Sequence, residues 1–321
     1  MKISDSLIVT STESVSQNDL AQIVQLIDSV TAPDGTRPIS EHVELHLREG
    51  GDEAARHLLV RKTNGALLGY AHLDCSDQVK GPSAELVISH DSGPEVLGHL
   101  LAGMSRDAAE SSLRLWARGD SKHLIDLANE QGFGVERELV KMGRSLFTSL
   151  PAIELPQGFT CRTFEPGKDE ELFLAANREV FKSLPDQKRW TRRDLTVRMK
   201  EDWFDPKGFF LIFANSDPNQ LAAFHWTKIH GQPRRIEAGR IPAPSHSHDA
   251  FGEIYVLGVT PKFQGHGLGQ AIAVIGLRHL VDKGLDSAIL YVDLNNSPAV
   301  ALYEKLGFSQ LSKDILFRKG A

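Results

Sequence analysis

The sequence predicts an α/β fold (an α+β mixed sheet) made of two tandem domains, each a mixed, mostly antiparallel sheet flanked by helices. The prediction rests on an internal repeat, because each half of the chain shows the order strand–helix–strand–strand–strand–helix–strand–helix–strand. The 321 residues are enough for two domains, and 41% of them are hydrophobic, as in globular proteins. A proline-containing stretch at 151–156 marks the boundary, so the predicted domains are residues 1–150 and 151–321.

The first copy opens with an apolar strand at residues 7–10, and polar residues 16–19 then begin a helix. Apolar residues at helical spacing define the buried face of that helix: Ile23, Leu26, Ile27 and Val30. The remaining predicted elements are strands at 58–61, 68–73 and 85–88 and a strand–helix pair within 113–133. The second copy repeats this order, with strands at 159–164, 209–213, 222–227, 254–259 and 288–292 and helices at 169–181 and 270–281.

The second copy contains a glycine-rich turn between a strand and a helix, with the sequence Gln-Gly-His-Gly-Leu-Gly at residues 264–269. Such a turn leaves backbone N–H groups without intrahelical partners at the positive end of the helix dipole, where a phosphate can bind. Gly265, Gly267 and Gly269 let the backbone approach an anion without an intervening Cβ. Taken alone, the turn is equally consistent with a tight connection that binds nothing.

Another strand and a capped helix follow the turn. Asn296 or Ser297 is suited to cap this helix, Pro298 suits its first position, and Gly307 closes it. Tyr303 recurs at helical spacing with apolar neighbours, which by itself indicates a core aromatic residue.

The combined pattern is more specific than either part. A strand, a Gln-x-x-Gly-x-Gly turn, a helix, a second strand and then Asn-x-x-Ala…Tyr…Leu-Gly-Phe resembles the acetyl-coenzyme A signature of the GNAT superfamily of N-acetyltransferases. The resemblance implies that acetyl-coenzyme A is the co-substrate. It also implies that the glycine-rich turn binds the pyrophosphate and that the end of the preceding strand binds the pantetheine arm. The implied cofactor-binding residues are Leu257, Gly258, Val259, Gln264, Gly265, His266, Gly267, Leu268, Gly269, Gln270, Asn296, Ser297, Pro298, Ala299, Val300 and Ala301.

Acetyl transfer to an amine requires a base for the ammonium and an acid for the departing thiolate. Tyr303 suits the acid, because a phenol with a reference pKa of about 10 can protonate a thiolate of comparable basicity. Glu253 suits the base, directly or through a water molecule. The alternatives are a packed Tyr303 without a chemical role and a Glu253 exposed at a strand edge, where it improves solubility.

Two further blocks narrow the resemblance. Residues 203–208 (Trp-Phe-Asp-Pro-Lys-Gly) and 224–228 (Phe-His-Trp-Thr-Lys) are not general GNAT features, and with them most of the chain resembles the mycothiol synthase family. That family acetylates the cysteinyl amine of desacetylmycothiol, a cysteine–glucosamine–inositol thiol. The implied substrate-binding residues are Glu41, Asp186, Lys228, Glu253 and Tyr291.

Each of these residues also has a purely structural interpretation. Glu41 and Asp186 would be loop or helix-cap acids, and Lys228 a solvated charge at a strand end. Asp186 also stands where the resemblance leads us to expect the longer glutamate. Three tryptophans of this copy are expected to form the core or the cleft walls: Trp190, Trp203 and Trp226.

The first copy lacks the residues that the chemistry needs. Ala128 and Trp116 stand at the positions of Tyr303 and Tyr291, and residues 89–95 replace the glycine-rich turn with one glycine and two acids. Fixed carboxylates repel a pyrophosphate. We therefore expect this domain to be catalytically inactive, with at most a cofactor contact at 86–88, and to support the second domain or wall its cleft.

The composition excludes several classes of protein. A net charge of −6 without a clustered basic arm argues against nucleic-acid binding, and no apolar stretch approaches the roughly 18 residues that span a membrane. The first twenty residues lack signal-peptide features, and Cys75 and Cys161 are too isolated for a disulfide framework or a zinc site. We expect a cytoplasmic monomer without a metal. Two other functions stay open: acetylation of another small amine, and a non-catalytic acyl-coenzyme A sensor.

Overall fold

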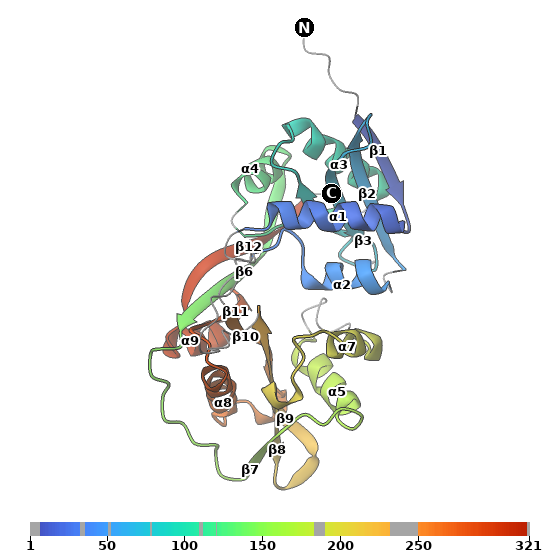
Figure 1. Ribbon diagram of the computed structural model, residues 1–321. Coiled ribbons are helices and arrows are strands. Elements are labelled where there is room, and N and C mark those ends of the chain that lie inside the picture. The colour runs from blue at the N-terminus through green and yellow to red at the C-terminus, as the bar shows by residue number, and fades with distance from the viewer. Residues whose placement is uncertain are drawn as a thin grey trace, which may run out of the picture. The chain divides into compact units, whose positions relative to one another are not determined.

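The computed structural model describes residues 7–32, 36–50, 53–77, 79–108, 112–119, 121–182, 190–231 and 250–319. The chain forms two compact units (Figure 1). Unit 1 comprises Met1–Leu139 and Ser312–Ala321, and unit 2 comprises Val140–Leu311. In the described part of the chain, no helix is long and apolar enough to cross a membrane.

Unit 1 is a mixed sheet with helices on its faces. Its strands are β1 (Leu7–Thr12), β2 (Ala55–Lys62), β3 (Leu67–Asp74), β4 (Ser83–Ile88) and β5 (Arg114–Ala117), and its helices are α1 (Gln17–Val30), α2 (Glu41–Glu49), α3 (Pro94–Asp107) and α4 (Lys122–Glu130). Strands β1 to β4 are antiparallel neighbours in chain order, and β5 is parallel to β4. The unit thus has the mixed, mostly antiparallel sheet that the sequence predicts.

Unit 2 repeats this arrangement. Its strands are β7 (Phe159–Thr163), β8 (Phe209–Ala214), β9 (Asp217–His230), β10 (Phe251–Val259) and β11 (Ser287–Asp293), and its helices are α5 (Glu170–Val180), α7 (Arg192–Met199), α8 (Leu268–Asp282) and α9 (Ser297–Lys305), with short 3-10 turns η1 (Pro206–Gly208) and η2 (Pro261–Phe263). Strands β7 to β10 are antiparallel neighbours, and β11 is parallel to β10. The predicted fold class is therefore confirmed in both copies.

Two long strands are divided between the units. They are β6 (Phe133–Ser145) and β12 (Ser309–Lys319). In unit 1, residues 315–318 of β12 pair antiparallel with β5. Strand β12, late in the chain, is therefore added between β5 and β6 to the sheet that begins with β1.

Each unit also has a second helix that the predicted order of elements lacks, α2 in unit 1 and α7 in unit 2. Both helices are short, and their apolar residues stand at alternate positions (43, 45 and 47; 195, 197 and 199), as in a strand. Their starts are fixed by side-chain caps instead. Ser40 accepts a hydrogen bond from the Val43 amide, and Thr191 and Asp194 form a reciprocal capping box.

The sheet of unit 2 is covered on both faces, with α8 on one side and α5 and α7 on the other (Figure 1). Apolar residues of α8, such as Val274 and Leu277, pack with Ile254 of β10. On the opposite face, Phe173 of α5 packs edge-on against Trp226 of β9. Two buried layers therefore hold β9 and β10 rigidly at the centre of the unit.

Candidate active site

Strands β10 and β11 run side by side for a short distance and then separate. Their parallel ladder in the described chain has three pairs and ends at Ile254 and Leu290. A β-bulge at Tyr255 shifts the register of β10 against β9, and the pairing to β9 then continues to Val259. The edge of residues 255–259 that faces away from β9 is thus open to a ligand that adds main-chain hydrogen bonds. It includes three predicted cofactor-binding residues: Leu257, Gly258 and Val259.

The glycine-rich turn leads from the end of β10 into α8. Gly265 and Gly267 have φ angles of 81° and 77°, in the left-handed region that residues with a Cβ disfavour, and Gly267 is the N-cap of α8. The first hydrogen bond at the helix start runs from the Ala271 amide to the Gly267 carbonyl. Among the described residues, no acceptor binds the amides of 265–270. The turn therefore presents a row of unsatisfied N–H groups at the positive end of a helix.

Side chains of the turn stabilise its shape without using these amides. The Gln264 side chain donates to the Val259 carbonyl at 3.3 Å. His266 Nδ1 lies 3.2 Å from the Phe263 carbonyl oxygen and 3.1 Å from that of Gln264, so it donates to both. The predicted anion-binding turn is thus braced by side chains that bind carbonyl groups.

The start of α8 lies beside α9 and the end of β10. A Cβ at Gly269 would lie 3.6 Å from both the Leu302 and the Val259 side chains. Lys305 Nζ, on the last turn of α9, lies 3.4 Å from the side-chain oxygen of Gln270. The three segments predicted to bind the cofactor, around 257–259, 264–270 and 296–301, are therefore brought together in unit 2.

Helix α9 begins as the sequence predicts, with one change. Asn296 is the N-cap, and its side chain accepts from the Ala299 amide at 3.4 Å. Ser297 is the first helical residue, so Pro298 occupies the second position and not the predicted first one. This position is also compatible with proline, because the first turn of a helix does not need its N–H groups.

Tyr303 is buried, with 7% of its surface exposed, and its ring packs edge-on against Phe308. Burial raises the pKa of its phenol well above the usual value. No described residue hydrogen-bonds to the hydroxyl group. Tyr303 is thus part of the core, as its spacing indicates, and it also keeps its proton at any physiological pH.

Strand register gathers polar side chains on one face of the sheet. Glu253 lies opposite Lys228 in the antiparallel ladder, and Phe251 lies opposite His230. Ile289 lies beside Glu253 in the parallel ladder, and Tyr291 follows two residues later. Because side chains alternate between faces, the side chains of Glu253, Lys228, His230 and Tyr291 share a face.

Glu253 is buried in the central strand of unit 2, with 8% of its surface exposed. The alternative of an exposed glutamate at a strand edge is therefore wrong, because β9 and β11 flank this residue on both sides. Its Oε2 lies 2.5 Å from Nε2 of His230. His230 is not among the residues predicted from the sequence. Its position two residues after Lys228 on a predicted strand would have placed it on the same face.

Lys228 is also buried, so the alternative of a solvated strand-end charge is wrong. Its Nζ lies 4.6 Å from the ring centre of Trp203 and 5.3 Å from that of Tyr255. Such distances allow cation–π attraction, which compensates part of the lost hydration. The Tyr255 hydroxyl accepts from Nε of Arg198 at 2.8 Å. The rings of Trp203 and Tyr255, together with the cations Lys228 and Arg198, thus form an aromatic wall beside Glu253.

The three tryptophans fit the expectation of core or wall residues. Trp226 is fully buried and Trp190 nearly so, while Trp203 is half-buried. The guanidinium of Arg198 stacks over the Trp190 ring at 4.2 Å. These contacts fix the wall in place.

The other predicted substrate residues are placed differently. Tyr291 lies on β11 and is 41% exposed. Glu41 is the first residue of α2 in unit 1, so its part in a site of unit 2 stays a prediction. Asp186 lies outside the described residues.

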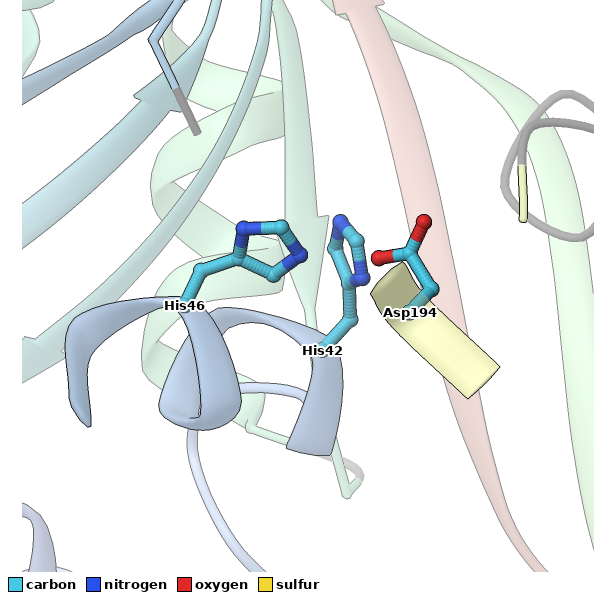
Figure 2. Close-up of side chains that lie close together, drawn as sticks. All are labelled: His42, His46 and Asp194. Atoms are coloured by element: carbon cyan, nitrogen blue, oxygen red, sulfur yellow. The ribbon is translucent and has the colours of Figure 1, made fainter. Parts of the chain in front are cut away.

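Figure 2 shows two histidines of unit 1, His42 and His46, which stand one turn apart on α2 with ring centres 4.3 Å apart. Asp194, drawn in the same view, belongs to unit 2, where its carboxylate accepts from the amide and hydroxyl of Thr191. Two imidazoles alone do not complete a structural zinc site. We assign no metal to this pair.

The corresponding turn of unit 1 differs as its sequence predicts. Gly93 is the N-cap of α3, and a Cβ at this position would lie 2.2 Å from Oε2 of Glu95. The Glu95 carboxylate therefore folds back over the helix start, where unit 2 has only backbone amides. A negative side chain at this end of a helix takes the position of a bound anion.

Comparison with known proteins places this geometry in context. Residues 177–308 match the model of the acetyltransferase (GNAT) family. A mycothiol acetyltransferase of Acidothermus cellulolyticus is 46% identical over 305 residues, covering 94% of this chain and 91% of the relative. Its counterpart in Thermobispora bispora is 41% identical over 301 residues, covering 94% and 96%. A tandem GNAT protein from the clavulanic acid biosynthesis pathway has a similar fold, with a TM-score of 0.69, 15% identity and 98% coverage of both chains.

Proposed function

The chain belongs to the mycothiol acetyltransferase family, and we propose that it transfers the acetyl group of acetyl-coenzyme A to the cysteinyl amine of desacetylmycothiol (Cys-GlcN-Ins), the last step of mycothiol biosynthesis. It is an acyltransferase of the GNAT superfamily, with acetyl-coenzyme A as co-substrate. The observation that supports the proposal most directly is the open edge of β10 beside the unsatisfied amides of 265–270.

The binding step follows from these two features. The amides of 265–270 donate to the pyrophosphate of the co-substrate, whose charge is also favoured by the start of α8. The open edge at Leu257–Val259 offers main-chain hydrogen bonds to the amides of the pantetheine arm. Residues 296–301, at the start of α9, line the other side of the channel.

The chemical step divides between two residues. Glu253 takes a proton from the substrate ammonium, directly or through water, and the free amine attacks the thioester carbon. A main-chain N–H of residues 257–259 stabilises the oxyanion that forms. As the carbon–sulfur bond breaks, Tyr303, which is protonated in the resting protein, gives its proton to the thiolate. One amide bond forms and one thioester bond breaks. The nitrogen gives up a second proton to solvent as the amide forms, and solvent returns a proton to Tyr303 after the thiol leaves.

Substrate recognition uses the face that carries Glu253. Lys228 and Tyr291 lie on this face, and they supply a cationic donor and a phenol for the hydroxyl groups of the sugar. We propose that Glu41 and Asp186 complete the contacts, as in the prediction from sequence. Catalysis thus belongs to residues 151–321, and residues 1–150 form a domain without catalytic activity.

The test is an assay of the purified protein with acetyl-coenzyme A and a panel of amines. The panel contains Cys-GlcN-Ins, an aminoglycoside, free cysteine and glucosamine. Mass spectrometry reads the addition of one acetyl group, and a thiol reagent shows that the product keeps its free thiol. Selective acetylation of Cys-GlcN-Ins supports the proposal. Acetylation of the other amines with Cys-GlcN-Ins ignored, or binding of acetyl-coenzyme A without turnover, contradicts it.

A further inference from the structure

We propose that His230 is a positioning residue of the acetyl transfer, which fixes the orientation of the Glu253 carboxylate and aims its other oxygen at the substrate amine. The inference rests on the proposed function. It starts from the contact of 2.5 Å between His230 Nε2 and Glu253 Oε2.

The direction of this hydrogen bond is fixed by chemistry. An ionised carboxylate can only accept, so Nε2 of His230 carries the hydrogen. The bond occupies Oε2 of Glu253, and Oε1 is the oxygen left to take the proton of the substrate ammonium. A charge-assisted hydrogen bond on one oxygen also fixes the orientation of the carboxylate.

The imidazole is held in place by its own neighbours. Its ring stacks on Phe251, with the centroids 4.5 Å apart and the planes 15° from parallel. Phe251 lies opposite His230 in the ladder between β9 and β10, and Glu253 follows two residues later on the same strand. Both partners of the hydrogen bond thus stand on adjacent, hydrogen-bonded strands, where their separation varies little.

Charged and titratable groups surround the pair from several elements. Lys228 of β9 and Tyr291 of β11 lie on the same face of the sheet as the pair. Arg198 of α7 reaches this face through its hydrogen bond to the Tyr255 hydroxyl. The two cations act on the carboxylate by charge, which is not directional. The specific contribution of His230 is therefore the fixed geometry of one donor.

The test compares two substitutions that separate the ring from the donor. His230→Phe keeps a ring to stack on Phe251 and removes the N–H group, whereas His230→Gln removes the ring and keeps an N–H donor. For His230→Phe we expect kcat for Cys-GlcN-Ins to fall at least about tenfold. For His230→Gln we expect a kcat close to that of the unmodified protein. The KM for acetyl-coenzyme A is expected to be unchanged in both variants.

The matched control is His123→Phe, the same substitution at an exposed histidine of α4 in unit 1, which is expected to leave turnover unchanged. Thermal melting and acetyl-coenzyme A binding establish that each variant is folded. If His230→Phe alone does not fold, His230→Gln decides, and a kcat that falls at least about tenfold in that variant overturns the inference. A His230→Phe variant with native kcat overturns this inference and leaves the proposed function standing. No turnover by the unmodified protein overturns the proposed function and this inference together.

Discussion

Glu85 and Arg118 form a two-pronged ion pair in unit 1, with Arg118 Nε 3.1 Å and Nη2 2.8 Å from the two carboxylate oxygens of Glu85. The amide and hydroxyl of Ser40, the N-cap of α2, donate to the same carboxylate. Arg118 also donates to Asp314 of β12 at 2.9 Å. The pair thus connects β4, α2 and the C-terminal strand within unit 1.

Glu85 stands in β4 at the position that Glu253 has in β10 of the repeated design. Burial alone raises the pKa of Glu85, but Arg118 and Ser40 outweigh it and lower the pKa below the usual value. Every lone-pair direction of this carboxylate faces a donor. The contrast with Glu253 supports the proposal that unit 1 keeps the fold of an acetyltransferase and uses the glutamate as a structural anchor.

The first prediction concerns this anchor. Glu85→Gln removes one of the two negative partners of the largely buried Arg118, and Asp314 remains. Leaving a buried charge without any partner costs about 3–5 kcal/mol, so a smaller loss is expected here. We expect the melting temperature to fall by several degrees and kcat per folded molecule to stay unchanged. The exposed carboxylate of Asp28 provides the control, because Asp28→Asn should leave melting nearly unchanged. A large loss of kcat with native melting would instead assign chemistry to Glu85.

The second prediction tests the acid. Tyr303→Phe keeps the buried ring and its contact with Phe308 and removes only the hydroxyl. Because the thiolate then leaves without a proton, kcat is expected to fall by about 10²–10⁴. Calorimetric titration should show an unchanged Kd for coenzyme A. A variant with native kcat would return Tyr303 to a packing role.

The third prediction tests the base. Glu253→Gln keeps an acceptor and the shape of the side chain and removes the charge. The substrate amine must then lose its proton to solvent, so we expect kcat/KM to keep rising with pH where the native profile is flat. Rate measurements across the pH range provide the check. A variant with the native profile at native rates would exclude Glu253 as the base.

Sequence and structure agree best where local rules decide. The glycine-rich turn and the Asn296 cap were predictable because glycine conformations and caps depend on a few adjacent residues. The burial of Lys228 and its aromatic neighbours was not, because Trp203 and Tyr255 reach it from other elements. His230 was missed for the same reason, since its contact with Glu253 depends on the register between β9 and β10.

The short helices α2 and α7 show a related limit. The apolar residues of each helix stand at alternate positions, which is typical of a strand, and the caps at Ser40 and Thr191 resemble ordinary turn residues. Their buried residues, such as Leu195, are defined only once the helix packs on the sheet. Tertiary packing therefore decides these elements.

The fourth prediction separates backbone strain from cofactor binding. Gly267 and Gly284 lie at opposite ends of α8 with φ angles of 77° and 76°, so alanine at either position costs about 1–2 kcal/mol. Only Gly267 belongs to the turn that we propose to bind the pyrophosphate. We expect both variants to melt at similarly reduced temperatures, and Gly267→Ala alone to weaken coenzyme A binding in calorimetry. Equal affinities in the two variants would remove the turn from the binding site.

The fifth prediction concerns stability against acid. His225 is fully buried under α8, its Nδ1 donates to the Ile272 carbonyl at 2.9 Å, and burial lowers its pKa to about 4. In the unfolded chain the imidazole has a pKa of about 6.5, so between these values the unfolded state binds a proton that the folded state excludes.

The free energy of unfolding is therefore expected to decrease as the pH falls from about 6.5 to about 4, by up to about 1.4 kcal/mol per pH unit. Above pH 6.5 this residue gives no slope, because it is neutral in both states. His225→Asn keeps an N–H donor and cannot be protonated, so its melting temperature should depend less on pH in that window. If the melting temperatures of the two proteins changed equally with pH between pH 4 and pH 6.5, His225 would not be held neutral by the fold.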